Sequence, residues 1–450
     1  MTSLLSSLFT SASAQVASRI ETMRAAESSL AELARQFATQ EYANDNLLTI
    51  TDTHIPREAV PLKESRGASN CLISTVSSDD DHLVIHGVKV INRRVATQEG
   101  SESKSPLVLL HGYMNGSLYF YKNLYGLARH FGTVHALDML GWGLSSRPTF
   151  QLPDDTVESA EAFFVESLEE WRKKNGIDKM MLGGHSMGGY LSVAYCEKYP
   201  HRVDRLILLS PVGVPAQDPE NDPLSKRDIS FRYRLMFGTF RYLWSRGTTP
   251  GSFARSIPES KSRSMVDGYV EARLPSITCP NERQILADYL YNNAMLPGSG
   301  EYSLNRILKP GAYARKPTVD RIPGLKVGHV SFVYGQNDWM DPMGGLEVQR
   351  RCHDRRAAGE SAPDVEVHGV RDAGHLLMLE NWEEFNSAVI IGAGGTVPSG
   401  LPVPSRFTSE EEHKDFFRKP SFSRQASEDE VTEDVTGEKM AAPAVDPVGA

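Results

Sequence analysis

Cysteine and long apolar runs are both scarce in this 450-residue sequence. Its four cysteines (Cys71, Cys196, Cys279 and Cys352) stand far apart and never in CxxC spacing. This argues against zinc sites and a disulfide framework, and it favours a reducing compartment. No apolar run approaches the roughly 18–20 residues that a membrane-spanning helix needs. We therefore expect an intracellular protein that is dissolved or lies peripherally on membranes.

An excess of basic charge is also lacking. The formal net charge is −9, and residues 405–450 account for −5 of it, with eleven acidic residues against six Lys plus Arg. The rest of the chain is close to neutral, so its charge indicates no nucleic-acid partner.

The N-terminus is Ser-rich and has no acidic residue before Glu21, as is typical of mitochondrial transit segments. Arg19 is, however, its only basic residue up to that point, and an ordinary N-terminus fits the same residues. A mitochondrial location therefore competes with a cytosolic one.

Short apolar runs alternate with helical segments through the first half of the chain. The stretch HLVIHGVKVINRRVA alternates apolar and polar residues, as half-buried antiparallel strands do. Continuous apolar runs follow at Pro106–Gly112, Thr133–Asp138, Lys179–Gly184 and Val203–Pro211. Buried runs separated by helices predict a mostly parallel central sheet covered by helices on both faces.

The alternation stops after Pro211 and resumes at Gly328–Asp341 and Asp364–His375. About 100 residues between them are too many for a plain loop, so we expect a helical cap inserted after the sixth strand. The predicted division is a helical lead-in at 1–75, a core at 76–213, the cap at 214–325, the rest of the core at 326–394 and a disordered acidic tail at 395–450.

A candidate nucleophile lies in the segment Gly184-His185-Ser186-Met187-Gly188. It follows an apolar run and opens a helical segment, which is the strand–turn–helix context of a nucleophile elbow. There the glycines permit close packing, the serine hydroxyl is exposed at the end of the sheet, and the helix N-terminus favours developing negative charge. We predict that Ser186 is the nucleophile.

Serine needs a base, and in this architecture the acid and then the histidine follow it along the chain. His375 comes directly after the last strand, and Asp338 follows the strand before it, with Asp341 as the alternative acid. Asp338 would hold the imidazole tautomer and stabilise the imidazolium. His111 and His185 are interpreted as structural, bonding backbone in the turns beside the site.

A tetrahedral intermediate needs two backbone donors. We predict the N–H of Met187, the residue after the nucleophile, and the N–H of Tyr113 in the turn HGYMNG, with Met114 as the alternative.

The motifs HGYMNG, DMLGWGLSSRP, GGHSMGG, YGQNDWMD and DAGHLLMLENWEEFN, together with EAFFVESLEEWR, resemble those of α/β-hydrolases. The resemblance is to the subfamily of α/β-hydrolase domain-containing proteins 4 and 5, which also includes fungal cardiolipin deacylases and a soluble plant lysophosphatidate acyltransferase. It covers about 106–213 and 326–386 well and the cap loosely. It implies an α/β-hydrolase fold and action on lipids.

Three details of the resemblance bear on function. The coactivator branch of the subfamily carries Asn in place of the nucleophile, whereas this chain has Ser186. The H-x4-D motif linked to acyl transfer is here His375 to Glu380, one methylene longer. Arg315 and Lys316 resemble a basic element of the subfamily before a proline.

The cap is basic and aromatic at its start. Residues 226–263 contain nine Lys plus Arg and two acidic residues, interleaved with aromatic rings. Arg232, Arg234 and Trp244, with Arg315 and Lys316, are therefore candidates for contact with lipid head groups. An ordinary solvated helix face is the alternative interpretation.

Two serines of the tail, Ser421 and Ser427, follow a basic residue by three positions, which makes them candidates for phosphorylation.

The sequence thus predicts a serine acyl-ester hydrolase that acts on a glycerophospholipid, cardiolipin or a related anionic lipid first, at a membrane or lipid-droplet surface. It predicts no metal and no organic cofactor, since serine acyl transfer needs none. The alternatives are an acyl-CoA-dependent lysophosphatidic acid acyltransferase and a non-catalytic scaffold that recruits a lipase.

Overall fold

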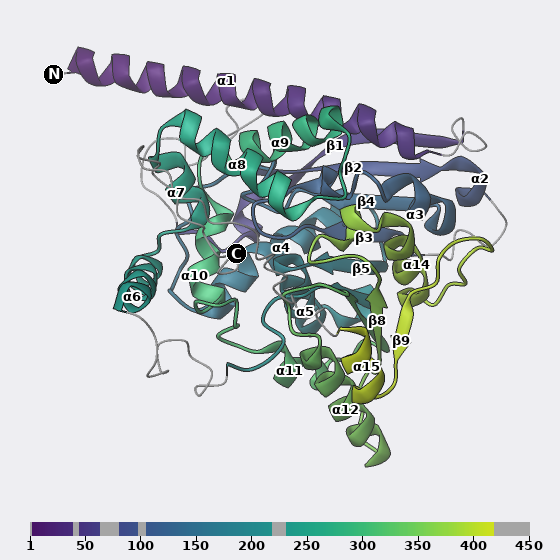
Figure 1. The fold of residues 1–450 in the computed structure, drawn as a ribbon. Coiled ribbons are helices and arrows are strands. Elements are labelled where there is room, and N and C mark those ends of the chain that lie inside the picture. The colour runs from purple at the N-terminus through teal and green to yellow at the C-terminus, as the bar shows by residue number, and fades with distance from the viewer. Residues whose placement is uncertain (1, 39–44, 64–80, 98–104, 218–230, 418–450) are drawn as a thin grey trace, which may run out of the picture.

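A computed structural model describes residues 2–38, 45–63, 81–97, 105–217 and 231–417 (Figure 1). The strands are β1 (Asn46–Pro56), β2 (His82–Asn92), β3 (Leu107–Leu110), β4 (Thr133–Leu137), β5 (Met180–His185), β6 (Val203–Leu209), β7 (His329–Gly335), β8 (Asp364–Val370) and β9 (Ser405–Phe407). The helices before the cap are α1 (Thr2–Ala34), α2 (Arg93–Ala96), α3 (Leu124–Phe131), α4 (Val157–Lys174) and α5 (Met187–Lys198). Those between β6 and β7 are α6 (Phe231–Ser245), α7 (Pro250–Ser256), α8 (Glu259–Arg273), α9 (Pro280–Met295), α10 (Leu304–Ile307) and α11 (Thr318–Arg321). The last are α12 (Met343–Ala357), α13 (Leu377–Glu380), α14 (Trp382–Gly392) and α15 (Glu410–Phe416).

The strands form one nine-stranded sheet in the order β1-β2-β4-β3-β5-β6-β7-β8-β9. The six from β4 to β8 run parallel, and β1, β2 and β9 complete the two edges in antiparallel pairing. A parallel block brings the carboxyl ends of β3, β5, β6, β7 and β8 to one edge, where the loops of an α/β sheet build their sites. The predicted fold class, a mostly parallel sheet covered on both faces, is confirmed.

The two faces of the sheet are buried by different helices. On β3, Val108 and Leu110 join the apolar cluster formed with α4, α5 and α12, whereas Leu107 and Leu109 join the cluster formed with α1, α3 and α14. Side chains of a strand alternate between faces, so a run that is apolar at every position is one buried on both sides. This explains why these strands read as continuous apolar runs.

The insertion between β6 and β7 is helical, from α6 to α11. In Figure 1 its helices α6–α9 gather on one side of the sheet, and α1 runs along α8 and α9. The predicted position of the cap, after the sixth strand, agrees with this order. None of the helices described is long and apolar enough to cross a bilayer.

The sheet extends beyond the core boundaries expected from the sequence at both ends. Strand β1 lies within the segment expected to be a helical lead-in, and β9 with α15 lies within the segment expected to be a disordered tail. Only one face of β1 is covered, and β9 has three residues, so neither carries a strong apolar run. Phe407 is nevertheless buried against Phe416 and Phe417. The segment expected to be a disordered tail therefore contains a packed element, β9 with α15, that its composition does not predict.

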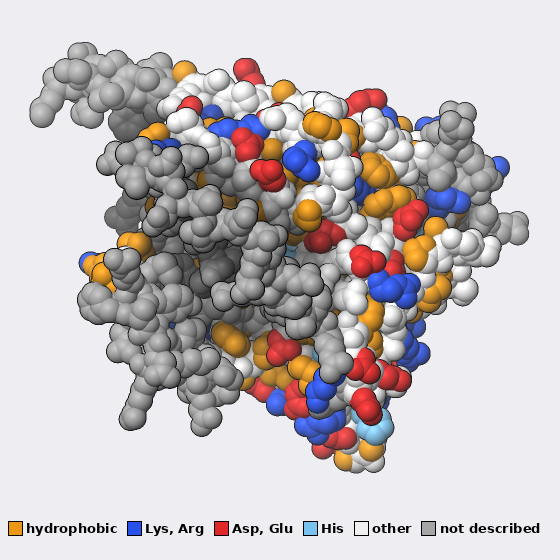
Figure 2. All heavy atoms as spheres, viewed as in Figure 1, with side chains coloured by type: hydrophobic (Ala, Val, Ile, Leu, Met, Phe, Trp, Pro, Cys, Tyr) orange, Lys and Arg blue, Asp and Glu red, His pale blue; other side chains and the backbone are white. Residues whose placement is uncertain are grey.

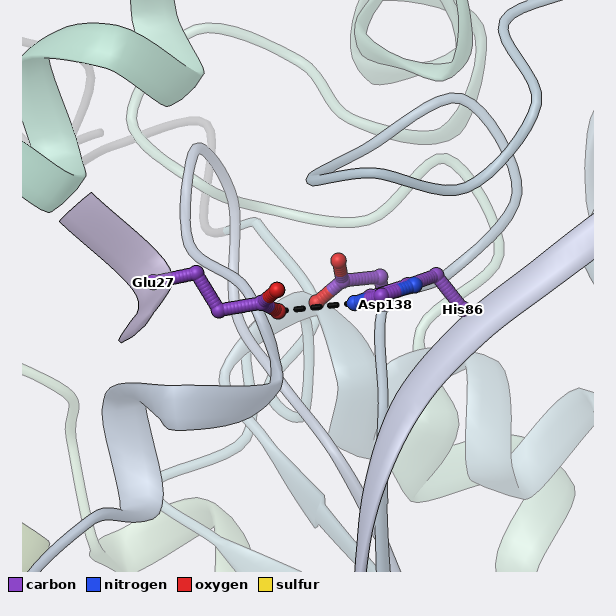
Figure 3. Close-up of side chains that lie close together, drawn as sticks. All are labelled: Glu27, His86 and Asp138. Atoms are coloured by element: carbon purple, nitrogen blue, oxygen red, sulfur yellow. Dashed lines mark hydrogen bonds and ion pairs between the residues drawn. The ribbon is translucent and has the colours of Figure 1, made fainter. Parts of the chain in front are cut away.

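Helix α1 is fastened to the sheet by a buried histidine (Figure 3). The His86 ring on β2 contacts Glu27 of α1 through Nε2 at 2.7 Å, as Figure 3 shows. Its Nδ1 contacts Asp52 of β1 at 2.6 Å. Burial alone would lower the pKa of His86, but the hydrogen bonds to the two carboxylates outweigh it and raise the pKa to about 10. The ring is therefore a buried cation between two carboxylates, and it ties three elements together.

Replacing His86 should destabilise the fold. In His86→Ala the buried Glu27 carboxylate loses its cation, a loss that typically costs about 3–5 kcal/mol. Because the folded-state pKa lies above the usual 6.5, this stabilisation is fully present below pH 6.5 and is lost as the pH rises through about 10. Urea denaturation at several pH values measures it, with the exposed His54→Ala on β1 as the control. Equal midpoints for the two variants at pH 7 would contradict this role.

Candidate active site

Ser186 occupies a strained turn between β5 and α5. Its φ is 53° and its ψ is −116°, a region that non-glycine residues rarely adopt. The turn is closely packed: a Cβ on Gly184 would lie 2.4 Å from the carbonyl oxygen of Gly188, and one on Gly188 would lie 2.6 Å from that of His111. Both glycines are thus required by contact, and the turn holds the serine at the end of the sheet.

The structure brings Ser186, His375 and Asp338 together. The Nε2 atom of His375 lies 3.1 Å from Ser186 Oγ, and its Nδ1 lies 3.1 Å from Asp338 Oδ1. Each residue comes from a loop after a parallel strand, namely β5, β7 and β8. The geometry is that of a nucleophile, a base and a group that orients the base.

Asp338 is held in its charged form although its side chain is fully buried. Burial would raise the pKa of this carboxyl, but the charge of His375 and the hydrogen bond to it prevail and lower the pKa. The N–H of Met340, which donates to Asp338 Oδ1 at 3.0 Å, favours the charge further.

Two rings flank His375, with centroids at 4.8 Å for His185 and 5.0 Å for Trp339. The Nε2–H of His185 donates to the His375 carbonyl oxygen at 2.9 Å, and burial lowers the pKa of His185 to about 3. His185 therefore stays neutral and does not repel an imidazolium at His375. His111 donates from Nδ1 to the Gly112 carbonyl and accepts the Met139 N–H at Nε2. Both histidines thus bond backbone beside the site.

The turn after β3 lies directly against the nucleophile. A Cβ on Gly112 would lie 2.9 Å from His185 Nδ1 and 3.0 Å from Ser186 Cβ, so a side chain here would crowd both residues. Within the described residues, the backbone N–H groups of Met187, Tyr113 and Met114 donate to no protein acceptor. Unused donors on two elements beside the serine are what an oxyanion site requires.

Glu380 supports the loop that carries His375 and does not contact the imidazole by a hydrogen bond. Its carboxylate accepts the N–H of Gly374 at 2.9 Å and that of Leu376 at 3.1 Å. Burial raises the pKa of Glu380 in spite of these two bonds. Its two oxygens thus hold the backbone on either side of the base.

Asp341, the alternative acid, lies apart from His375 and is exposed. It accepts the N–H of Met343 at the start of α12. Asp338 is therefore the residue that the fold presents to the base.

The residues predicted to contact lipid differ in exposure and in their partners within the protein. Trp244 is wrong as a contact residue: it is only 7% exposed, because this face of α6 packs on the body of the protein. Arg315 is exposed but donates to the Asn305 carbonyl, and Lys316 pairs with Glu158. The side chains of Arg232 and Arg234, and both tail serines Ser421 and Ser427, lie outside the described residues.

One group in the described residues has the composition of a metal site: Glu27, His86 and Asp138, with ligand atoms within 4.8 Å of one another (Figure 3). Its atoms already have protein partners, because His86 bonds Glu27 and the Asp138 oxygens accept the N–H groups of Ser117 and Leu144. The contacts within the protein therefore explain why these three side chains lie together, and His86 with Glu27 attaches α1 to the sheet.

Comparison with known proteins agrees with this geometry. A sequence model of the family described as "alpha/beta hydrolase fold" matches residues 105–381. The chain belongs to the α/β-hydrolase family. This α/β-hydrolase is 30% identical over 377 residues to the "Probable 1-acylglycerol-3-phosphate O-acyltransferase" of Oryza sativa subsp. japonica, covering 82% of the chain and 84% of the rice protein.

Two animal proteins are also similar to this α/β-hydrolase. The "(Lyso)-N-acylphosphatidylethanolamine lipase" of Mus musculus is 31% identical over 304 residues, covering 66% of the chain and 81% of the mouse protein. The "1-acylglycerol-3-phosphate O-acyltransferase ABHD5" of Rattus norvegicus is 32% identical over 294 residues, covering 64% and 76%. These relatives confirm the resemblance to the subfamily of α/β-hydrolase domain-containing proteins 4 and 5.

The two neighbouring aspartates of this α/β-hydrolase allow a matched test of the acid. Asp338→Asn removes the charge that orients His375 and stabilises its cation, and we expect kcat to fall by about 10³–10⁴-fold. Asp341→Asn, three residues further on, should stay within a few-fold of the wild type. Hydrolysis of a soluble p-nitrophenyl ester measures both. If Asp341→Asn is the more damaging change, the two assignments are reversed.

Proposed function

We propose that this protein is a serine hydrolase that cleaves acyl esters of lipids, with Ser186 as the nucleophile. The observation that carries the proposal is the pair of 3.1 Å contacts that link Ser186 Oγ, the His375 ring and Asp338. Membership of the α/β-hydrolase family supports hydrolysis as the type of reaction.

The first half of the reaction forms an acyl-enzyme. Ser186 Oγ attacks the ester carbonyl carbon while its proton passes to His375 Nε2, and Asp338 stabilises the imidazolium through Nδ1–H. The N–H groups of Met187 and Tyr113 would bind the oxyanion. As the intermediate collapses, His375 gives the proton to the leaving alcohol oxygen. Water, deprotonated by the same histidine, then releases the fatty acid and restores Ser186.

A glycerophospholipid is the proposed substrate class, with cardiolipin or a related anionic phospholipid first. The relatives' names include a lipase for an N-acylated phospholipid and acyltransferases for a lysophospholipid, which supports an acylated glycerolipid. The excess of nine Lys plus Arg over two acidic residues at 226–263 favours an anionic head group.

We place the protein peripherally on a membrane or lipid-droplet surface, with the cap towards the lipid. On α6, Leu235 is 60% exposed, Tyr242 is 57% exposed and Leu243 is also exposed, as is Phe253 on α7. Figure 2 shows apolar side chains at the edge of the molecule where α6 lies. Exposed apolar residues beside arginines are typical of surfaces that lie at a membrane interface.

Acyl transfer from acyl-CoA to lysophosphatidic acid is the second candidate, favoured by the names of the plant and rat relatives. It would use His375 and Glu380 without the serine. The Glu380 carboxylate already accepts two backbone N–H groups, which assigns it to the loop and weakens this candidate. A scaffold that recruits a separate lipase would need neither Ser186 nor His375.

The proposal is tested by the release of fatty acid from liposomes of mixed phospholipids that include cardiolipin. Ser186→Ala should lower the rate by at least about 100-fold, because the triad acts as a unit. Ser192→Ala is the matched control, since that serine lies on α5 and bonds the Gly188 carbonyl. The lysolipid left by the wild type identifies the head group.

The other candidates predict different results in the same preparation. Acylation of lysophosphatidic acid that survives Ser186→Ala but is lost in His375→Ala would replace the hydrolase proposal with the acyltransferase. If the wild type neither releases acyl chains nor acylates lysophosphatidic acid, the non-catalytic scaffold is the candidate that remains.

A further inference from the structure

A residue of the cap reaches into the turn that is proposed to bind the oxyanion. Asn293 lies near the end of α9, more than 170 residues along the chain from that turn, and is 2% exposed. Its Nδ2 donates to the carbonyl oxygen of Met114 at 3.0 Å and to that of Asn115 at 2.9 Å. One side chain therefore holds two successive peptide units of the turn.

The hydrogen bonds of its oxygen, Oδ1, fix the orientation of the Asn293 amide. Its Oδ1 accepts the N–H of Gly143 at 3.0 Å and Nη2 of Arg147 at 2.8 Å. A side-chain amide has two donor hydrogens and two acceptor sites, and all four are used. A flipped amide would face two carbonyls with its oxygen and two donors with its nitrogen, so only one orientation is compatible with the surroundings.

Arg147 is itself immobilised. It is 1% exposed, and its guanidinium donates to the carbonyl oxygens of Pro297 at 2.8 Å and Gly143 at 3.1 Å. Burial lowers the pKa of Arg147 only to about 10, so it remains a cation at neutral pH. A charged donor makes a stronger hydrogen bond than a neutral one, which anchors the Asn293 oxygen firmly.

The turn needs such external support. Met114 has a φ of 58°, an unfavourable value for a residue with a side chain. The backbone bond that closes the turn, from the Asn115 N–H to the Gly112 carbonyl, is long at 3.3 Å. The bonds from Asn293 hold the two peptide planes that follow Met114, and they stabilise the strained bend that the Tyr113 and Met114 N–H groups precede.

We propose that Asn293 is a positioning residue: by holding the bend at Met114 it aims the unused N–H groups of Tyr113 and Met114 at the oxyanion, which makes the cap part of the catalytic apparatus. This inference rests on the proposed hydrolase function. A lid that only covers the substrate could be altered without effect on the chemical step, whereas a cap that carries Asn293 cannot.

Asn293→Asp separates positioning from simple anchoring of the cap. The carboxylate has the same shape and can still accept from Gly143 and pair with Arg147, so the attachment of α9 is retained. It has no N–H to give to the Met114 and Asn115 carbonyls and repels them instead. Asn293→Ala removes both functions. Asn292→Ala is the matched control, because that amide only donates to the Asp288 carbonyl within α9.

The measurements are kcat and KM for p-nitrophenyl butyrate, the Ki of butylboronic acid, and the melting temperature. The boronate is bonded reversibly by Ser186 Oγ, whose proton passes to His375, and one boron-bound oxygen then occupies the oxyanion position. We expect Asn293→Asp to lower kcat by about 10- to 100-fold, with KM within about three-fold of the wild type. The Ki should rise by the same factor as kcat/KM falls, and Asn292→Ala should behave like the wild type.

If the Asn293→Asp variant is folded and its kcat and Ki equal those of the wild type, the inference is overturned and the hydrolase proposal stays intact. So would a loss of kcat without a matching rise in Ki. A wild-type protein that neither hydrolyses the ester nor binds the boronate would instead contradict the hydrolase proposal itself. If Asn293→Ala fails to fold, the isosteric Asp variant still decides, since its melting temperature is measured beside its kinetics.

Discussion

The strained turn at Ser186 is the constraint on which the rest of the site depends. The φ of 53° at Ser186 occurs in a turn packed so closely that a side chain on Gly184 or Gly188 would clash with backbone. The strain directs the serine hydroxyl away from the sheet and presents the Met187 N–H beside it. His375, Asp338 and the turn after β3 are positioned around Ser186, whose backbone this close packing constrains.

Sheet topology supplies those neighbours. The parallel strands β3, β5, β6, β7 and β8 end at one edge, so five loops from distant parts of the chain converge there. Electrostatics sets the charge of the groups around His375: Asp338 stays charged beside it, and His185 stays neutral against the same ring. Glu380 holds the backbone on either side of His375, and Asn293 holds the turn after β3.

The sequence was sufficient for the central fold, and it named the three side chains, Ser186, Asp338 and His375, that the structure brings into contact. Both are local signals: a run buried on both faces, and a Gly-x-Ser-x-Gly turn. It was insufficient where the determinant is a distant contact. The strands β1 and β9 can be recognised only from the strands they pair with in the folded protein. The prediction for Trp244 was wrong because its face of α6 packs inwards. Asn293 lies in a helix with an ordinary composition, so only the fold connects it with Met114. Glu380 was noted from its spacing, but its bonds to the backbone had no local signature.

The most direct test of the account is to find where a fluorophosphonate, which reacts with activated serines and does not turn over, becomes attached. Intact mass and peptide sequencing of the labelled protein should place a single adduct on Ser186, and the label should be absent from Ser186→Ala and strongly slowed in His375→Ala. An adduct on another residue, or no adduct in a folded wild-type protein, would contradict the assignment of Ser186 as an activated nucleophile.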